Sequence, residues 1–117
     1  EVSDFSALFQ DSKRSDFSGI EDWDVSHVTN MRNMFRGAVN FNSDISSWDV
    51  SNVRDMSYMF YDANSFNQSL DNWDVSNVKN MENMFFSVAD VVNTFAGLFG
   101  AKQQLPNKKR LPKWYKE

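Results

Sequence analysis

A 25-residue repeat is the feature that most constrains the fold of this chain. The segment Trp-Asp-Val-Ser-(His/Asn)-Val occurs three times and begins at Trp23, Trp48 and Trp73. Each copy is followed by the same pattern of two Met residues and one Phe: Met31, Met34 and Phe35; Met56, Met59 and Phe60; Met81, Met84 and Phe85. Because so many positions agree in type and in phase, the sequence predicts an array of similar units.

Each unit is predicted to contain one short strand and one short helix. Val53, Met56, Met59 and Phe60 have the spacing of a helical face, and their counterparts in the other copies repeat it. Phe-Asn-x-x-(Ile/Leu) stretches, such as residues 66–70, predict the strand. The Ser of each Trp-Asp-Val-Ser segment suits a helix N-cap, and its Asp suits an Asx-turn.

One unit cannot bury its own large apolar side chains, so stacking of units is expected. The predicted fold class is therefore α/β, a solenoid of ~25-residue coils, each with one short parallel strand and one short helix. Residues 1–16 are assigned to an N-terminal partial coil and residues 17–86 to three repeats. An amphipathic pattern predicts a C-terminal capping helix over 87–100, with docking of a partner as the alternative role. Residues 101–117 form a basic tail.

The residue inventory argues against enzyme chemistry. The chain has no Cys and one His, and the partners of a catalytic triad or a His-rich metal site are missing. We therefore expect no catalytic residue, no cofactor and no metal. Asp24, Asp49 and Asp74 recur once per coil and are expected to cap the backbone, although a Ca²⁺ ion between coils is an alternative. The sequence has no run of 18 apolar residues that would predict a transmembrane segment.

Charge is distributed unevenly along the chain. Residues 1–100 hold six Lys and Arg against fifteen Asp and Glu, a net charge of −9, whereas residues 101–117 hold six against one, a net charge of +5. The acidic body argues against a nucleic-acid partner. Three roles remain open for the tail: folding back on the body through charge and Trp114, linking to another segment, or binding an anionic partner.

Candidate partner-binding residues are those that vary where the repeat is otherwise constant. Large aromatic or cationic side chains occur on the outer face of the predicted helices and in the tail, and such residues favour protein interfaces. The outer-face candidates are Arg32, Arg36, Tyr58, Tyr61 and Phe86, and those of the tail are Lys109, Arg110 and Trp114.

The repeat resembles the BspA-like repeat of bacterial surface proteins, which also occurs in mycoplasma lipoproteins. The resemblance rests on Trp-Asp-Val-Ser-Asn-Val-x-x-Met-x-x-Met-Phe with Phe-Asn-x-x-(Ile/Leu) between copies, over residues 17–85. It implies a leucine-rich-repeat-like solenoid at the cell surface, with some relatives acting as adhesins. The expected function is thus non-enzymatic protein binding or surface display, with a host-matrix or cell-surface protein as partner. A structural spacer, or anion or nucleic-acid binding through the tail, is the alternative.

Overall fold

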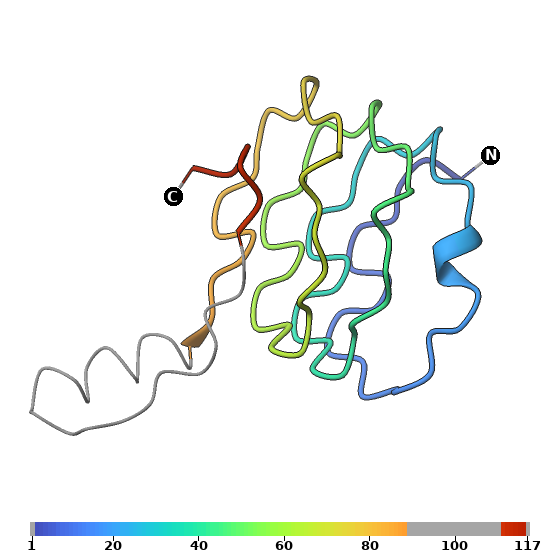
Figure 1. The fold of residues 1–117 in the computed structure, drawn as a ribbon, viewed down its shortest axis with the longest axis vertical. Coiled ribbons are helices and arrows are strands. Elements are labelled where there is room, and N and C mark those ends of the chain that lie inside the picture. Colours follow the sequence, from blue (N-terminus) through green and yellow to red (C-terminus); the bar gives the residue numbers. More distant parts are fainter. Residues whose placement is uncertain (1, 89–110, 117) are drawn as a thin grey trace, which may run out of the picture.

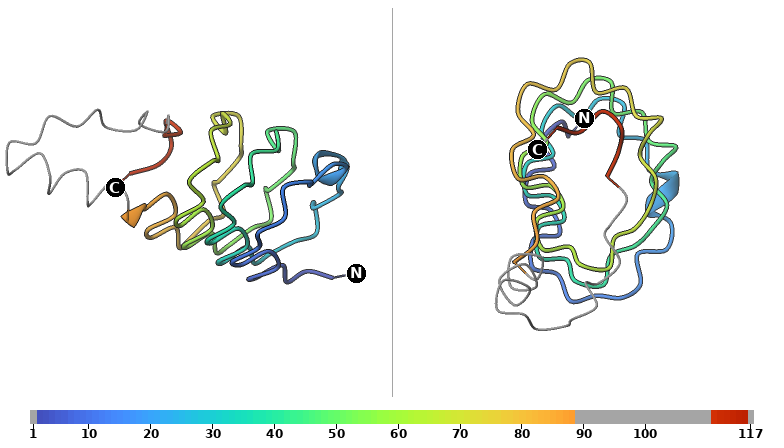
Figure 2. Two further views of the ribbon diagram at one scale, coloured as in Figure 1. Left: turned by 90° about the horizontal axis from the view of Figure 1, so that it is seen from below. Right: turned by 60° about the vertical axis from the view of Figure 1, so that its left-hand side comes forward.

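The chain winds through successive turns that lie side by side and form a stack. The computed structural model describes residues 2–88 and 111–116. Figure 1 shows the turns following one another along the stack, and the right-hand view of Figure 2 shows them as nearly superimposed loops. In the described part of the chain, no helix is long and apolar enough to cross a membrane.

One side of each turn carries most of the hydrogen bonds between turns. We call these four stretches the ladder segments, and they comprise residues 4–11, 30–37, 55–62 and 80–87. They begin at isolated parallel bridges, Asp4↔Asn30, Asn30↔Asp55 and Asp55↔Asn80. Alternate backbone amides of one ladder segment then donate to carbonyl groups of the next. The bonds from the second segment to the third are typical, with N···O distances of 2.9 Å from Met31 to Asp55, 3.0 Å from Asn33 to Ser57 and 2.9 Å from Phe35 to Met59.

The predicted α/β fold class, with one strand and one helix per coil, is wrong. Among the described residues, the secondary-structure element with defined bounds is η1, a 3₁₀ helix at Ile20–Asp22. The contacts between turns are isolated bridges, and residues 2–88 and 111–116 form no strand or sheet. The repeat therefore builds its stack from tight turns, without the regular elements of a leucine-rich-repeat-like solenoid.

The ladder segments are not helices because the backbone of each one alternates between right-handed and left-handed conformations. In an α-helix every amide bonds to the carbonyl four residues earlier, and the backbone keeps a negative φ. Here Asn33 and Gly37 have φ values of 60° and 71°, and Tyr58 and Asp62, one turn later, have 58° and 55°. The amides of these left-handed residues donate to the next turn, as from Asn33 to Ser57 and from Gly37 to Tyr61. The Met-x-x-Met spacing thus marks the buried side of a folded turn.

The strand predicted over residues 66–70 does not form because side chains take the place of a backbone ladder there. The Asn67 amide donates to Oδ1 of Asn42 at 2.8 Å, and Nε2 of Gln68 donates to the Asn42 carbonyl at 3.0 Å. The bridges between turns lie instead at the polar positions that open the ladder segments. Strand prediction from apolar residues therefore pointed to the wrong side of the turn.

Equivalent apolar side chains from successive turns form one continuous core. The rings of Phe9, Phe35, Phe60 and Phe85 follow one another with centroids 5.6, 5.7 and 5.5 Å apart and nearly parallel planes. The Met residues on the inner side of the second and third ladder segments are fully buried. The core therefore follows the repeat: each turn covers the apolar face of the one before it.

The C-terminal segment, residues 111–116, folds back over the last turn (Figure 1). The Trp114 ring stacks on Trp73 with centroids 6.4 Å apart and planes at 8°. The Lys113 amide donates to Oδ1 of Asp71 at 2.9 Å, and the Tyr115 ring lies edge-on to Phe85. Of the three roles considered for the tail, folding back on the body describes this segment. The capping helix predicted over 87–100 lies, beyond residue 88, outside the described residues.

Candidate partner-binding surface

Five of the predicted partner-binding residues come together on the outer side of the ladder segments. We call this set the aromatic–arginine patch, and it comprises Arg32, Arg36, Tyr58, Tyr61 and Phe86. They belong to three consecutive ladder segments, so the stacking of turns is what assembles them. Residues 54 positions apart in the sequence thereby share one surface.

Cation–π and ring contacts connect the members of the patch. The Arg36 guanidinium carbon lies 5.0 Å from the centre of the Tyr58 ring and 4.5 Å from that of Tyr61. Arg32 lies 5.3 Å from the centre of the Tyr58 ring. Tyr61 stacks on Phe86 with centroids 5.3 Å apart. A cation at this distance is attracted to the negative face of an aromatic ring, so the two arginines hold the tyrosines in place.

Arg32 has additional partners that fix its position. Its Nη1 donates to Oγ of Ser57 at 2.8 Å and lies 3.9 Å from a carboxylate oxygen of Asp55. Ser57 is fully buried, and its hydroxyl in turn donates to Oδ1 of Asp55 at 2.6 Å. The guanidinium therefore sits on a short polar chain within the third ladder segment, and less side-chain entropy is lost if a partner binds it.

The patch keeps enough exposed surface to contact another molecule. Phe86 is 39% exposed, and both tyrosines and both arginines are partly exposed. Large amphipathic rings beside arginines are typical of the residues that carry binding energy at protein interfaces. The left-handed backbone at Tyr58 is not specific to the patch, because Asn33 and Asn83 share it at the equivalent positions.

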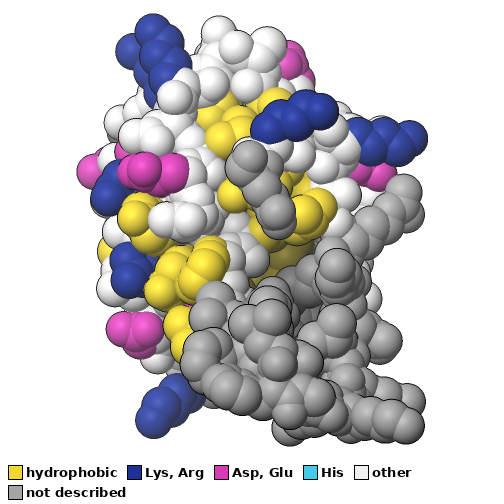
Figure 3. Space-filling model, turned by 90° about the vertical axis from the view of Figure 1, so that its left-hand side faces the viewer, with side chains coloured by type: hydrophobic (Ala, Val, Ile, Leu, Met, Phe, Trp, Pro, Cys, Tyr) yellow, Lys and Arg dark blue, Asp and Glu magenta, His cyan; other side chains and the backbone are white. Residues whose placement is uncertain are grey.

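The other predicted site residues lie elsewhere. Trp114 covers the last turn at the C-terminal end of the stack, where Figure 3 shows hydrophobic side chains gathered beside the residues drawn in grey. Lys109 and Arg110 fall outside the described residues. His27 is partly buried and lies edge-on to Phe5, with ring centroids 6.4 Å apart, as suits a packed surface residue.

The repeated Asp residues act on the backbone, as the sequence predicted. Oδ1 of Asp24, Asp49 and Asp74 each accepts the amide of the Ser two residues later at 3.0 Å, which is an Asx-turn. The Ser hydroxyl and amide bonds lower the pKa of all three carboxyl groups, and they outweigh the repulsion that Asp24 and Asp74 exert on Asp49. The Ser residues begin no helix, so the N-cap prediction for them is wrong.

The described part of the chain brings no three His, Asp or Glu side chains together in a group that could hold a metal ion. The carboxylates of the repeat are each bonded to their own Ser instead. This arrangement favours the capping role of the Asp residues over the Ca²⁺ alternative.

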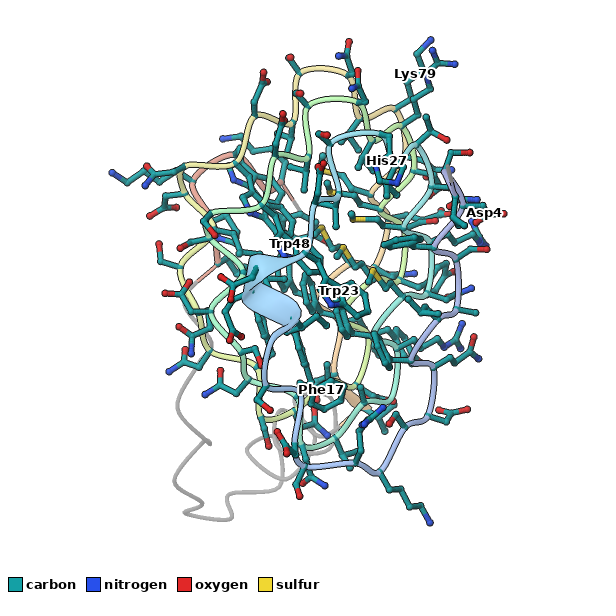
Figure 4. All side chains as sticks on the ribbon, turned by 90° about the vertical axis from the view of Figure 1, so that its right-hand side faces the viewer. Asp4, Phe17, Trp23, His27, Trp48 and Lys79 are labelled. Atoms are coloured by element: carbon teal, nitrogen blue, oxygen red, sulfur yellow. The ribbon has the colours of Figure 1, made fainter. Side chains whose placement is uncertain are left out.

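Sequence reasoning missed an exposed apolar face at the N-terminal end of the stack. Trp23 is 40% exposed and Leu8 is 47% exposed, whereas Trp48 and Trp73 are each 4% exposed. A small pocket beside Trp23 is lined by Phe9, Phe17 and Ile20 and by the polar residues Arg14, Asp16 and Ser18. Figure 4 shows Trp23 and Phe17 at this end of the stack. The signal was present in the sequence, because Trp23 is the first copy of this core residue among the described residues, and no described turn packs on its N-terminal side.

These features define a repeat protein whose stacked turns support an exposed aromatic–arginine patch. The chain belongs to the family described as Mycoplasma protein of unknown function, DUF285, whose model matches residues 1–109. No curated protein and no solved structure gives a significant match to the chain.

Proposed function

We propose that this chain is a non-enzymatic protein-binding module and that it binds its partner through the aromatic–arginine patch. The observation that carries the proposal is the convergence of Arg32, Arg36, Tyr58, Tyr61 and Phe86 on one surface. None of these residues is among the repeated core positions, so the stack does not need them in order to form. Their chemistry suits a protein surface that offers carboxylates for the arginines and apolar groups for the rings.

We further propose that the module is displayed at the cell surface and contributes to adhesion. Membership in a mycoplasma family and the resemblance of the repeat to BspA-like surface proteins support this proposal. Limited proteolysis of intact cells tests it, since a surface module is degraded while a cytoplasmic marker protein stays intact. Protection of both proteins until the cells are lysed would contradict it.

The tail is a weaker candidate for the binding site. Trp114 is engaged with the last turn, and Pro112 beside it is buried. Its aromatic contacts therefore serve the body of the molecule. The patch, in contrast, lies on the outside of the turns, where a partner can reach it.

A binding assay with matched variants tests the role of the patch. Purified extracellular-matrix proteins and host-cell surface proteins are immobilised, and binding of the chain is measured by surface plasmon resonance. We expect Arg36→Ala to weaken binding at least about tenfold, because the substitution removes a cation that contacts two rings. Lys79→Ala is the control, because it removes one positive charge at an exposed position outside the patch.

Two outcomes would contradict the proposal. Equal losses for Arg36→Ala and Lys79→Ala would indicate that general charge, and not the patch, determines binding. No binding to any protein of the panel by the folded chain would remove the support for a matrix or cell-surface partner.

A further inference from the structure

Three members of the aromatic–arginine patch occupy the same position of successive ladder segments. Arg36, Tyr61 and Phe86 each lie six residues after the bridge residue that opens their segment. We call these three residues the outer row. Because neighbouring ladder segments pair in parallel, their side chains leave the stack on the same side, one turn after another.

Contacts within the outer row fix its order and its length. The Arg36 guanidinium carbon lies over the Tyr61 ring, 4.5 Å from its centre. Phe86 stacks on Tyr61 with centroids 5.3 Å apart and planes at 17°. Tyr61 therefore joins a cation at one end of the row to an apolar ring at the other. The Arg36 guanidinium carbon and the Phe86 centroid are at most 9.8 Å apart, the sum of the two distances.

The two arginines of the patch differ in how their charge is compensated. Arg32 lies 3.9 Å from Asp55, which offsets part of its charge, and donates to Ser57. Arg36 forms no ion pair with a described carboxylate, and its Nη1 makes one long bond, at 3.4 Å, to Oδ1 of Asn33. A guanidinium has five N–H donors. Arg36 therefore keeps both donors and positive charge for an anion from outside the chain.

The rest of the outer row suits an apolar group next to that anion. Phe86 is 39% exposed, and Tyr61 covers one side of its ring. In the first ladder segment, the residue at the same position as Arg36 is Gln10, which is neutral. The row therefore contains no carboxylate that would compete for Arg36 or repel an acidic partner.

From these observations we propose that the patch binds an extended segment of its partner in which one residue separates an acidic from an aromatic residue. This inference rests on the proposed function and specifies the partner's chemistry. Arg36 pairs with the carboxylate through two parallel hydrogen bonds, and the aromatic ring packs on Phe86. Arg32 is a positioning residue, because it holds Tyr58, whose ring in turn contacts Arg36.

The spacing follows from the length of the row. In an extended chain, residues two apart point to the same side and lie about 6.6 Å from each other, which fits within the row. Adjacent residues point to opposite sides, and residues four apart are separated by about 13 Å, which is longer than the row. The spacing of one intervening residue is therefore the one that lets both side chains reach it.

Three synthetic peptides test this specificity on the unmodified, ¹⁵N-labelled chain. The probe is acetyl-Gly-Glu-Ser-Phe-Gly-amide. One control replaces Glu by Gln, and the other has the order Glu-Phe-Ser, with the same composition and charge. Binding is followed by NMR through the Arg Nε–H signals and the backbone amides of the ladder segments. We expect a dissociation constant on the order of 1 mM for the probe, as for a short flexible peptide.

Both controls are expected to bind more weakly than the probe. The Gln peptide should bind at least about tenfold more weakly, because it loses the charge-assisted bonds to Arg36. The Glu-Phe-Ser peptide should also bind more weakly, because its two side chains point to opposite sides when it is extended. The probe should shift the Nε–H signal of Arg36 more than that of Arg32.

Two matched variants test the division of roles between the arginines. Arg36→Lys keeps the charge but lacks the planar fork that pairs with a carboxylate, so the probe should bind at least about tenfold more weakly. Arg32→Lys keeps a cation beside Asp55 and Tyr58 and should retain most of the affinity. Backbone amide spectra verify that both variants are folded. The peptide comparison itself requires no variant.

Several results would overturn this inference without affecting the proposed function. Equal binding of the Glu and Gln peptides would show that the patch takes up apolar groups without recognising a carboxylate. Equal binding of the two Glu peptides would rule out the spacing, and equal losses for the two Lys variants would rule out the separate roles of the arginines. If no peptide shifts the patch signals at about 10 mM while Arg36→Ala still weakens binding to an immobilised protein, the acidic–aromatic motif is wrong and the patch remains the binding site.

Discussion

The two ends of the stack present the same repeat position in opposite states. Trp23 at the N-terminal end is 40% exposed, whereas Trp73 at the C-terminal end is 4% exposed. Both begin the same Trp-Asp-Val-Ser segment, so the local sequence does not cause the difference. Trp73 has Ile45 as its hydrogen-bond acceptor on one side and the Trp114 ring on the other, whereas no described turn lies on the N-terminal side of Trp23. Burial in this molecule is therefore set by neighbouring turns.

This dependence on neighbours is what a one-dimensional stack should show. The stability of such a protein is approximately the sum of the contributions of each turn and of each contact between adjacent turns. A substitution at one repeat position should therefore have different effects in the middle, at the covered end and at the open end. The same substitution, Trp→Ala, can be made at each of these positions to measure the difference.

The largest effect is expected for Trp48→Ala. Trp48 is buried between two turns, and its indole donates to the Ile20 carbonyl. Removal of the ring leaves a cavity and an unpaired carbonyl, which should lower the free energy of unfolding by ~3–5 kcal/mol. Urea denaturation followed by circular dichroism measures this value. A loss below that of Trp23→Ala would contradict the assignment of Trp48 to the centre of the core.

An intermediate effect is expected for Trp114→Ala. The ring is only partly buried, but it makes one indole hydrogen bond and stacks on Trp73. Loss of one hydrogen bond and one aromatic contact corresponds to about 1–3 kcal/mol in the free energy of unfolding. Urea denaturation followed by circular dichroism measures this value as well. Lys116→Ala, which changes an exposed residue of the same segment, is the control and should have almost no effect.

The smallest effect among the Trp variants is expected for Trp23→Ala. Trp23 packs edge-on against Phe5 and close to Phe9, but it has no hydrogen-bond acceptor among the described residues. The expected loss is about 1 kcal/mol, the contribution of exposed aromatic contacts. If this loss equalled that of Trp48→Ala, the N-terminal face would be covered in solution, and the comparison between the two ends would fail.

The sequence predicted the positions of the core because the repeat itself reveals them. Recurrence every 25 residues places equivalent residues above one another, so the Phe and Met columns follow from the spacing alone. The Asx-turns could also be predicted, because an Asp two residues before a Ser forms this turn locally. What these predictions share is that each depends on a repeated or a local interaction.

The secondary structure was mispredicted because a spacing of three residues does not identify a helix. The positive φ values at Asn33, Gly37 and Asp62 decide the backbone path, and these residue types tolerate them. Residue type gave an incomplete signal for them, because Ala7 and Tyr58 take the same left-handed conformation in the first and third segments. The residues of the aromatic–arginine patch were predicted from the sequence, but their proximity was not, since it depends on how the three ladder segments align with one another. The position of Trp114 was open for the same reason, because no repeat spacing leads to it.

The Asp residues provide a contrast with the Trp series, because their bonds lie within one turn. Asp24, Asp49 and Asp74 each form the same local bonds to a Ser at both ends and in the middle. We therefore expect Asp→Ala at the three positions to give nearly equal losses in the free energy of unfolding at pH 7. Unequal losses that followed the order of the Trp variants would show that these turns also depend on their neighbours.

The pH dependence of stability separates the Asp series from the Trp series further. Hydrogen bonds from Ser lower the pKa of each carboxyl group below its usual value of 3.8, so the folded state favours the ionised form. This contribution to stability is complete above pH 3.8 and is lost as the pH falls below that value. The difference between the unmodified chain and each Asp variant should therefore shrink as the pH falls below 3.8. Asp49 is also repelled by Asp24 and Asp74, which offsets part of the stabilisation from its hydrogen bonds. At low salt, Asp49→Ala should therefore lower the free energy of unfolding slightly less than Asp24→Ala or Asp74→Ala does, and added salt should remove this difference. The middle position would then matter least for the Asp series and most for the Trp series, as expected if Asp acts within a turn and Trp acts between turns.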